Sequence, residues 1–216
     1  MTRLPCRTAI APCPRPLRRS LRLSLAALLL CSPVAHAVDG TITINGEIID
    51  STCKINGQNP PVNLVVNLPK IGTSALKKPG DVAGTTAFTL TLTECPSELM
   101  GQVKAHFEPG PTTDYDTGHL YAYTTTTVKA KTSTIPAGQA SETKFQNVQI
   151  QLANSDGSPI KIGAADSLAK GTALQAGSEG KKSATLHYLA RYYKSGTDAI
   201  TAGKLYTYVQ YSIVYP

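Results

Sequence analysis

The chain has 216 residues, of which 41% are hydrophobic, and it carries a formal net charge of +7. Six of the positive charges are arginines within residues 1–37, a segment without acidic residues, so residues 38–216 carry a formal charge of only +1. A nearly neutral chain lacks the basic surface that nucleic-acid binding requires, which excludes that class of protein.

Residues 1–37 have the three parts of a secretory signal peptide. Their basic stretch leads into an apolar run from Leu23 to Cys31 and then into Ala35-His36-Ala37. This order predicts cleavage after Ala37, and the run is too short to anchor the chain in a bilayer. A lipoprotein signal on Cys31 is the alternative, but the three leucines before it are not the small residues expected there. We therefore expect an exported, periplasmic or extracellular protein.

Residues 38–216 consist of short segments in which apolar and polar residues alternate, which is typical of strands. They are rich in Thr, Val, Ile and Tyr, which favour strands, and turn residues separate them. The predicted strands are Thr41–Asp50, Val62–Leu68, Thr86–Glu94, Val103–Glu108, Leu120–Lys131, Lys144–Leu152, Ile160–Ile162, Ala184–Tyr193 and Leu205–Tyr215. Short strands with almost no helical periodicity predict a single all-β domain, a β-sandwich.

The first predicted strand begins almost at the expected cleavage site. Val38, Gly40, Ile42 and Ile44 alternate with polar residues and would share one face. The segment is either the first strand of the sandwich or a strand that is free to leave its own domain and add to another sheet. Glu47–Asp50, closer to Cys53, is expected to belong to the sandwich.

Cys53 and Cys95 are the two cysteines outside residues 1–37. Two cysteines in an exported chain most simply form one disulfide. In the chain-entropy model a bond closing a loop of about 43 residues stabilises the fold by roughly 4 kcal/mol. A pair of metal ligands is the alternative, but the spacing matches no zinc motif.

No motif of an enzyme or of a cofactor site is found in the chain. The histidines His106 and His187 lie in predicted strands without a nucleophile or carboxylate at a recognisable spacing. The sequence contains no nucleophile elbow, phosphate loop, zinc-protease helix or dinucleotide fingerprint. We therefore expect neither catalysis nor a cofactor.

Two polar features could each be a binding site, but each is also explained by an ordinary solvent-exposed surface. Asp114, Asp116 and His119 could hold a metal ion, but they follow Pro109-Gly110-Pro111 and are equally typical of a solvated loop tip. Small basic clusters could contact a sulfated polysaccharide, although a solvated face explains them more simply. These clusters are Lys77-Lys78, Lys181-Lys182, and Lys129 with Lys131.

Five segments, in a consistent order, carry a family resemblance. They are GTITINGEIIDSTC at 40–53, FTLTLTEC at 88–95, NVQIQLANSDGSPI at 147–160, LARYY at 189–193 and YSIVYP at 211–216. With the signal peptide and the cysteine pair, they make the chain resemble the major subunits of chaperone–usher fimbriae. VKAHFEPGPTTDYDTG at 103–118 and the ending IVYP make it most similar to the serotype-specific fimbrial subunits of Bordetella.

The resemblance implies an incomplete immunoglobulin-like β-sandwich, the pilin fold, which a donor strand from a neighbouring subunit or chaperone completes. Residues 38–46 would be the N-terminal donor-strand extension and 47–216 the pilin domain. In this family a periplasmic chaperone fills the groove left by the missing strand, and at the outer-membrane usher the extension of the next subunit replaces it. The donor residues carried over by position are Val38, Gly40, Ile42 and Ile44. The groove and chaperone-contact residues are Val209, Tyr211, Ile213, Tyr215 and Pro216.

The implied function is that of a structural subunit of a bacterial surface fimbria that supports adhesion to host surfaces. Its partners would be identical subunits in a head-to-tail helical polymer, the chaperone, the usher and a tip adhesin, with host sulfated glycans as a further candidate. A glycan- or receptor-binding β-sandwich adhesin module is the alternative function.

Overall fold

The computed structural model describes residues 42–49, 52–126 and 143–216. The chain divides into residues 1–47 and residues 48–216. In the first unit, residues 42–47 have no regular secondary structure, and Ile42 and Ile44 are 89% and 90% exposed. The predicted strand Thr41–Asp50 is therefore wrong for residues 42–49, because a strand needs a hydrogen-bonded neighbour and these residues form no ladder in the described part of the chain.

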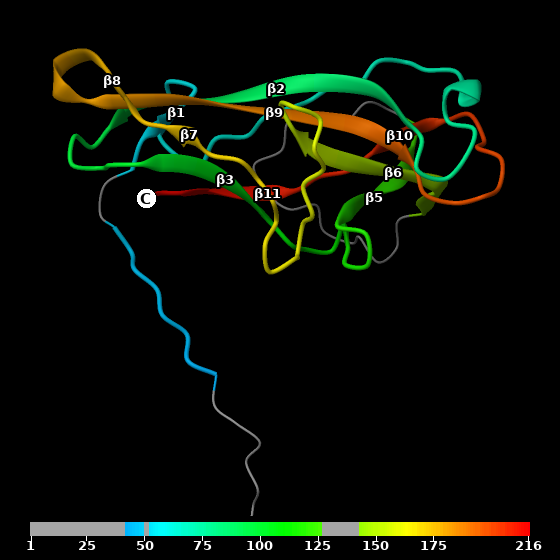
Figure 1. Ribbon diagram of the computed structural model, residues 1–216. Helices are drawn as coiled ribbons and strands as arrows, with labels where there is room; N and C mark the ends of the chain where they lie inside the picture. Colours follow the sequence, from blue (N-terminus) through cyan, green and yellow to red (C-terminus); the bar gives the residue numbers. More distant parts are fainter. Residues whose placement is uncertain (1–41, 50–51, 127–142) are drawn as a thin grey trace, which may run out of the picture. The chain divides into compact units, whose positions relative to one another are not determined.

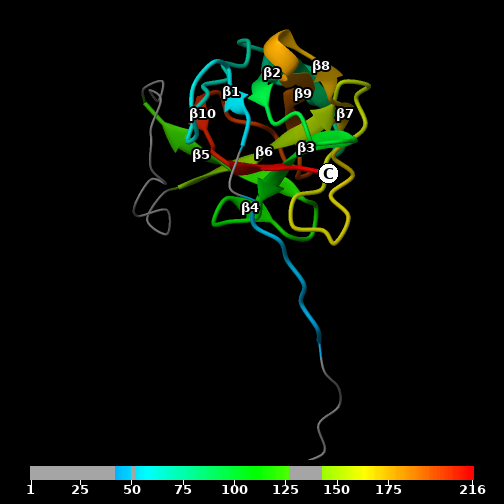
Figure 2. The ribbon, with the colours of Figure 1, turned by 90° about the vertical axis from the view of Figure 1, so that its left-hand side faces the viewer.

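Residues 48–216 form a β-sandwich of one large and one small sheet (Figures 1 and 2). The large sheet is antiparallel, in the order β1-β2-β9-β6-β5-β10, with β4 paired to β5 and β8 to β9. Its strands are β1 (Lys54–Ile55), β2 (Val82–Cys95), β4 (Thr113–Asp114), β5 (His119–Thr125), β6 (Lys144–Asn154), β8 (Gln175–Ala176), β9 (Lys182–Lys194) and β10 (Lys204–Tyr206).

The small sheet has the order β11-β3-β7, with β3 (Gln102–Glu108) between β11 (Gln210–Val214) and β7 (Thr172–Ala173). In Figure 1, β3 and β11 lie side by side beneath the long strands β2 and β9. The described residues also include two short 3-10 helices, η1 (Thr73–Ala75) and η3 (Ser178–Gly180). The described residues include no helix that is both long and apolar enough to span a membrane.

The core lies between the two sheets, where the alternation predicted from sequence places one face of each long strand. Leu90 of β2, Leu186 of β9 and Val103 of β3 are at most 1% exposed. The rings of Phe107 and Tyr188 meet edge to face at 5.2 Å between centroids. Burying an apolar side chain of this size stabilises a fold by about 1.5–3 kcal/mol, so these facing rows hold the sheets together.

The predicted disulfide is present. Cys53 and Cys95 are bonded at an S–S distance of 2.06 Å, and both are fully buried. Because Cys53 directly precedes β1 and Cys95 ends β2, the bond fixes the start of the domain to the edge of the large sheet.

The single strand predicted over Leu205–Tyr215 is wrong, since the chain forms two strands there. β10 pairs with β5 in the large sheet, whereas β11 pairs with β3 in the small one. Residues 207–209 cross between the sheets. Two hydroxyls hold this crossover: Thr207 Oγ1 donates to the carbonyl oxygen of Tyr121 at 2.7 Å, and Thr112 Oγ1 donates to that of Tyr208 at 2.7 Å.

Two other predicted strands, Val62–Leu68 and Ile160–Ile162, are also wrong. Their apolar side chains do enter the core, since Val62, Ile160 and Ile162 are buried. Ile162 N–H donates to the carbonyl of Gly118 at 3.1 Å instead of joining a ladder. A Cβ at Gly118 (φ +74°) would lie 2.7 Å from Lys161 Cα, so this close approach requires glycine. Burial without a continuous ladder thus produces the same sequence pattern as a strand.

Four of the other predictions are confirmed in place, and the fifth is confirmed for residues 120–125. Thr86–Glu94, Val103–Glu108, Lys144–Leu152 and Ala184–Tyr193 lie within β2, β3, β6 and β9. Leu120–Lys131 begins within β5, which ends at Thr125, and its residues 127–131 lie outside the described residues.

Candidate functional site

β11 has a paired strand on one side only within the described residues. Its ladder with β3 runs from Gln210 opposite Glu108 to Val214 opposite Lys104. The other side of β11 is an edge of the small sheet. A free edge presents unpaired backbone N–H and C=O groups that can hydrogen-bond another extended chain.

The inward face of β11 is apolar. Tyr211 and Ile213 alternate with the exposed Gln210, Ser212 and Val214. The half-buried side chains that pack against the core from this end of the chain are Val209, Tyr211, Ile213 and Tyr215, the row predicted from sequence.

A second apolar row comes from residues 62–68. Val62 is 7% exposed, and the half-buried Leu64, Val66 and Leu68 pack against the same core. This segment has the alternating pattern of a strand, but it forms no strand. Both rows pack against the same core, and we refer to them together as the groove, with residues 209–215 as one wall and residues 62–68 together with Cys53 as the other.

Two tyrosine side chains connect β11 to the opposite wall. Tyr211 Oη donates to the carbonyl oxygen of Val62 at 2.8 Å. The backbone N–H of Cys53 donates to Tyr215 Oη at 3.1 Å. Burial raises the pKa of Tyr211, so this hydroxyl remains a proton donor at any physiological pH.

Pro216, predicted as a contact residue, is exposed and packs against Gly101. A Cβ at Gly101 would lie 3.0 Å from Pro216 Cβ, and its φ of +113° also favours glycine. The close approach of Gly101 to Pro216 places the end of the chain, just after β11, next to the start of β3.

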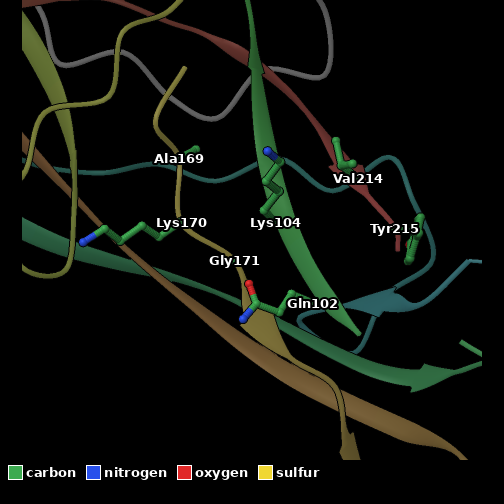
Figure 3. Close-up of a pocket in the computed structure, with 7 residues that line it drawn as sticks. All are labelled: Gln102, Lys104, Ala169, Lys170, Gly171, Val214 and Tyr215. Carbon is green, nitrogen blue, oxygen red and sulfur yellow. The ribbon is translucent and has the colours of Figure 1, made fainter. Parts of the chain in front are cut away.

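A hollow of about 620 Å³ adjoins this end of β11. Figure 3 shows Lys104 and Gln102 on β3, between the segment Ala169–Gly171 on one side and Val214 and Tyr215 on the other. Lys170 Nζ forms an ion pair with the carboxylate of Asp156, a residue that does not line the hollow. Lys104 is therefore the lining cation without an ion pair among the described residues.

The predicted donor residues fall into two groups. Ile42 and Ile44 are exposed in a segment without regular secondary structure. Val38 and Gly40 lie outside the described residues.

In the polar loop, the side chains of Asp114 and His119 form hydrogen bonds, whereas Asp116 contributes its backbone N–H, which donates to Asp114 Oδ1 at 3.1 Å. Asp114 pairs with His119 across β4 and β5 and accepts a hydrogen bond from Gln149 Nε2 at 2.6 Å. Burial raises the pKa of Asp114, but the bonds from Gln149 and from backbone and hydroxyl groups of the loop outweigh it and lower the pKa. In the described part of the chain, no three His, Cys, Asp or Glu side chains gather as a metal site.

Sequence reasoning did not identify the partners of this network, Gln149, Gln151 and Arg191. The glutamines alternate with Val148, Ile150 and Leu152 on β6, and that pattern places them on the outer face. It gave no sign that Gln149 and Gln151 are 6% and 5% exposed.

The two lysine clusters within the described residues lie apart from each other. The antiparallel register of β2 and β9 places Lys77-Lys78 and Lys181-Lys182 near opposite ends of β2. The backbone amides of Lys77 and Lys78 donate to Asp81 Oδ2 at 2.8 and 2.9 Å, and the amide of Lys78 is the main cause that lowers the pKa of Asp81. Lys129 and Lys131 lie outside the described residues.

Comparison with known proteins adds independent information. The family model "Type-1 fimbrial protein, A" matches residues 68–216. The serotype 2 fimbrial subunit of Bordetella pertussis is 44% identical, covering 93% of this chain and 99% of the relative. Fimbrial protein FimX of the same species is also 44% identical, over 88% and 96%, and the major fimbrial subunit SMF-1 of Stenotrophomonas maltophilia is 37% identical, over 87% and 99%.

Two solved structures share the fold. The P pilus rod subunit PapA superposes with a TM-score of 0.52 at 16% sequence identity, covering 77% of this chain and 100% of the other. A chain of a chaperone–usher pilus gives 0.50 at 18% identity, covering 86% and 100%. At these identities the likeness concerns the arrangement of strands alone.

Proposed function

The chain belongs to the type-1 fimbrial protein family and is a structural subunit of a bacterial surface fimbria, and from this premise we propose that its groove accepts a donor strand from the next subunit. The fimbria forms as each subunit completes the sandwich of its neighbour. Because donor segment and groove are different surfaces of the chain, the contact is head-to-tail, and such contacts generate a helical filament.

The observation that carries this proposal is the edge of β11 that has no strand partner in the described residues, joined by Tyr211 to the apolar row 62–68. An inserted strand would hydrogen-bond through its main chain and place alternate side chains between Leu64, Val66 and Leu68 on one side and Tyr211 and Ile213 on the other. Main-chain bonds supply affinity in such β-strand additions, and alternate side chains supply register.

The donor is the segment 38–46, with Val38, Gly40, Ile42 and Ile44 as the inserted residues. Exposed isoleucines such as Ile42 and Ile44 are unfavourable in water, and burial in a groove removes that cost. Residues 47–216 are the pilin domain that receives the donor.

Export precedes assembly. Residues 1–37 are removed as a signal peptide, a periplasmic chaperone fills the groove, and the exchange takes place at an outer-membrane usher. On this proposal the chaperone contacts Val209, Tyr211, Ile213, Tyr215 and the carboxylate of Pro216. The fibre ends in a tip adhesin and stands on the cell surface.

Adhesion follows from repetition. One subunit offers only dispersed lysines, but a polymer repeats each pair many times, and multivalent contacts gain avidity without a stronger single site. Contact with host sulfated glycans would then be a property of the fibre rather than of the single subunit.

The test is electron microscopy of cells that express the subunit with its chaperone and usher. Ile42→Asn with Ile44→Asn should abolish filaments while chaperone-bound subunit accumulates. Thr41→Asn with Thr43→Asn, on the alternate face of the same segment, is the matched control and should leave filaments in place. Filaments of normal length in the isoleucine variant would overturn donor-strand assembly through this segment.

A further inference from the structure

Tyrosine hydroxyls join the two walls of the groove at two points. Tyr211 Oη binds the carbonyl oxygen of Val62, and Tyr215 Oη binds the N–H of Cys53. The tyrosines are four residues apart on one face of the chain, a span of about 13 Å for an extended segment. Ile213 lies between them and also faces the core.

Both bonds end on backbone groups of the opposite wall. Val62 lies in a segment without a ladder, and Cys53 directly precedes β1. Partly buried backbone groups need partners, and here side-chain hydroxyls take the place of a neighbouring strand. A donor strand that pairs with this wall requires the same carbonyl and N–H.

We propose that Tyr211 and Tyr215 form a clasp in the subunit that is free of chaperone, and that a donor strand binds there by displacing both hydroxyls from Val62 and Cys53. This inference rests on the proposed function, since the occupant is the donor segment of another copy of this chain. The clasp slows entry, because each hydroxyl bond must break before the donor forms its own. A segment that cannot take over these backbone bonds does not displace it.

The chain supplies a matched control. Tyr208 Oη is buried and has no hydrogen-bond partner among the described residues. Tyr208→Phe therefore removes a phenolic hydroxyl two residues before β11 without breaking a bond, whereas Tyr211→Phe and Tyr215→Phe each break one.

The experiment measures how fast the exported, processed subunit takes up a labelled peptide with the sequence of residues 38–47. Loss of one hydrogen bond of ordinary strength predicts uptake about fivefold faster for Tyr211→Phe and for Tyr215→Phe, and faster still for the double variant. Tyr208→Phe should match the unmodified subunit. Equal rates in all variants would overturn the clasp and leave the proposed function standing.

Amide hydrogen exchange in the free subunit gives a second readout that needs no peptide. The Cys53 amide should exchange faster in Tyr215→Phe, and its exchange rate should be unchanged in Tyr211→Phe. An unaltered Cys53 amide in Tyr215→Phe contradicts the clasp. Failure of the unmodified subunit and of every variant to take up the peptide contradicts the proposed function and the clasp together.

Discussion

The phenol of Tyr188 and the backbone of Ala105 link the two sheets of the sandwich. The N–H of Ala105 on β3 donates to Tyr188 Oη on β9 at 2.9 Å, and the phenol donates in turn to the carbonyl oxygen of Lys170 at 3.1 Å. The last residue pair between β3 and β7 is Val103 with Thr172. Ala105 therefore has no strand on that side, and the phenol serves as its hydrogen-bond partner.

Tyr188→Phe should lower the free energy of unfolding by about 1–3 kcal/mol, because the buried N–H of Ala105 would lose its acceptor. Urea denaturation followed by circular dichroism measures the change. Tyr208→Phe removes a phenolic hydroxyl that has no partner in the described structure, so it should leave the midpoint unaltered or raise it. Equal midpoints for the two variants would contradict the role of Tyr188.

Replacing both Cys53 and Cys95 with alanine should reduce stability by roughly 4 kcal/mol, because the unfolded chain regains the entropy of an open loop. The midpoint of urea denaturation reports the loss. The unmodified protein in the presence of a reductant should approach the variant. A change below about 1 kcal/mol would show that the loop constraint contributes little.

His119 has a defined proton arrangement. Arg191 Nε donates to Gln151 Oε1 at 2.8 Å, so the amide nitrogen of Gln151 faces His119 Nε2, also at 2.8 Å. Nε2 of His119 is then the acceptor, and the neutral ring carries its proton on Nδ1, which has no partner among the described residues. Protonation of Nε2 would place two donors against each other.

Stability should therefore fall as the pH drops below about 6.5. Burial lowers the pKa of His119; Gln149 and Asp114 oppose this, while Arg191 and Lys161 add to it. The unfolded chain then binds the proton first, so stability is complete above the ordinary histidine pKa of about 6.5 and declines below it. Comparing urea midpoints at pH 7.5 and 5.5 tests this. His119→Gln should lose most of the difference, and an undiminished difference would refute the assignment.

Asn154 anchors the segment that lines the hollow beside β11. Its buried amide donates to Ser158 Oγ at 3.0 Å and to the carbonyl oxygen of Leu168 at 2.9 Å, and it accepts from the N–H of Lys170 at 2.8 Å. Asn154→Ala should destabilise the domain by about 3 kcal/mol, since several buried partners are lost at once. Hydrogen exchange should increase first in residues 163–171.

The control for Asn154 is Asp156→Asn, which removes the exposed ion pair between Asp156 and Lys170. Exposed pairs contribute little because water and salt screen them, so this variant should leave stability nearly unchanged. Equal effects of the two variants would contradict the larger role that we assign to the amide of Asn154.

The amino-acid pattern predicted those parts of the fold that depend on which side of a strand faces the core. Phe88, Leu90 and Leu92 alternate along β2, and Val103 and Phe107 do so along β3, with the expected faces buried or half-buried. The cysteine count alone sufficed for the disulfide. Period-two alternation is a local property, and it holds from Thr86 to Leu92 of β2 and along β3, while β2 departs from it at the irregularities near its two ends.

What the pattern could not predict depends on distant partners. Val62–Leu68 has the alternation of a strand, but a ladder also requires a neighbour, which this segment does not have in the described structure. Alternation of apolar and polar residues continues through residues 207–209, so the sequence does not indicate that the chain crosses between the sheets there. The row of Tyr211 and Tyr215 was predictable, whereas their bonds to Val62 and Cys53, 149 and 162 positions away, were not.

The pairing of β3 with β11 also sets the order in which the domain can be built. β11 follows every other strand along the chain, and β3 pairs otherwise only with the two-residue β7. Until residues 210–214 have been synthesised, the edge of β3 opposite β7 lacks its partner strand. Contacts between residues about a hundred positions apart form slowly. The small sheet is therefore completed only when the last strand of the described chain has been made.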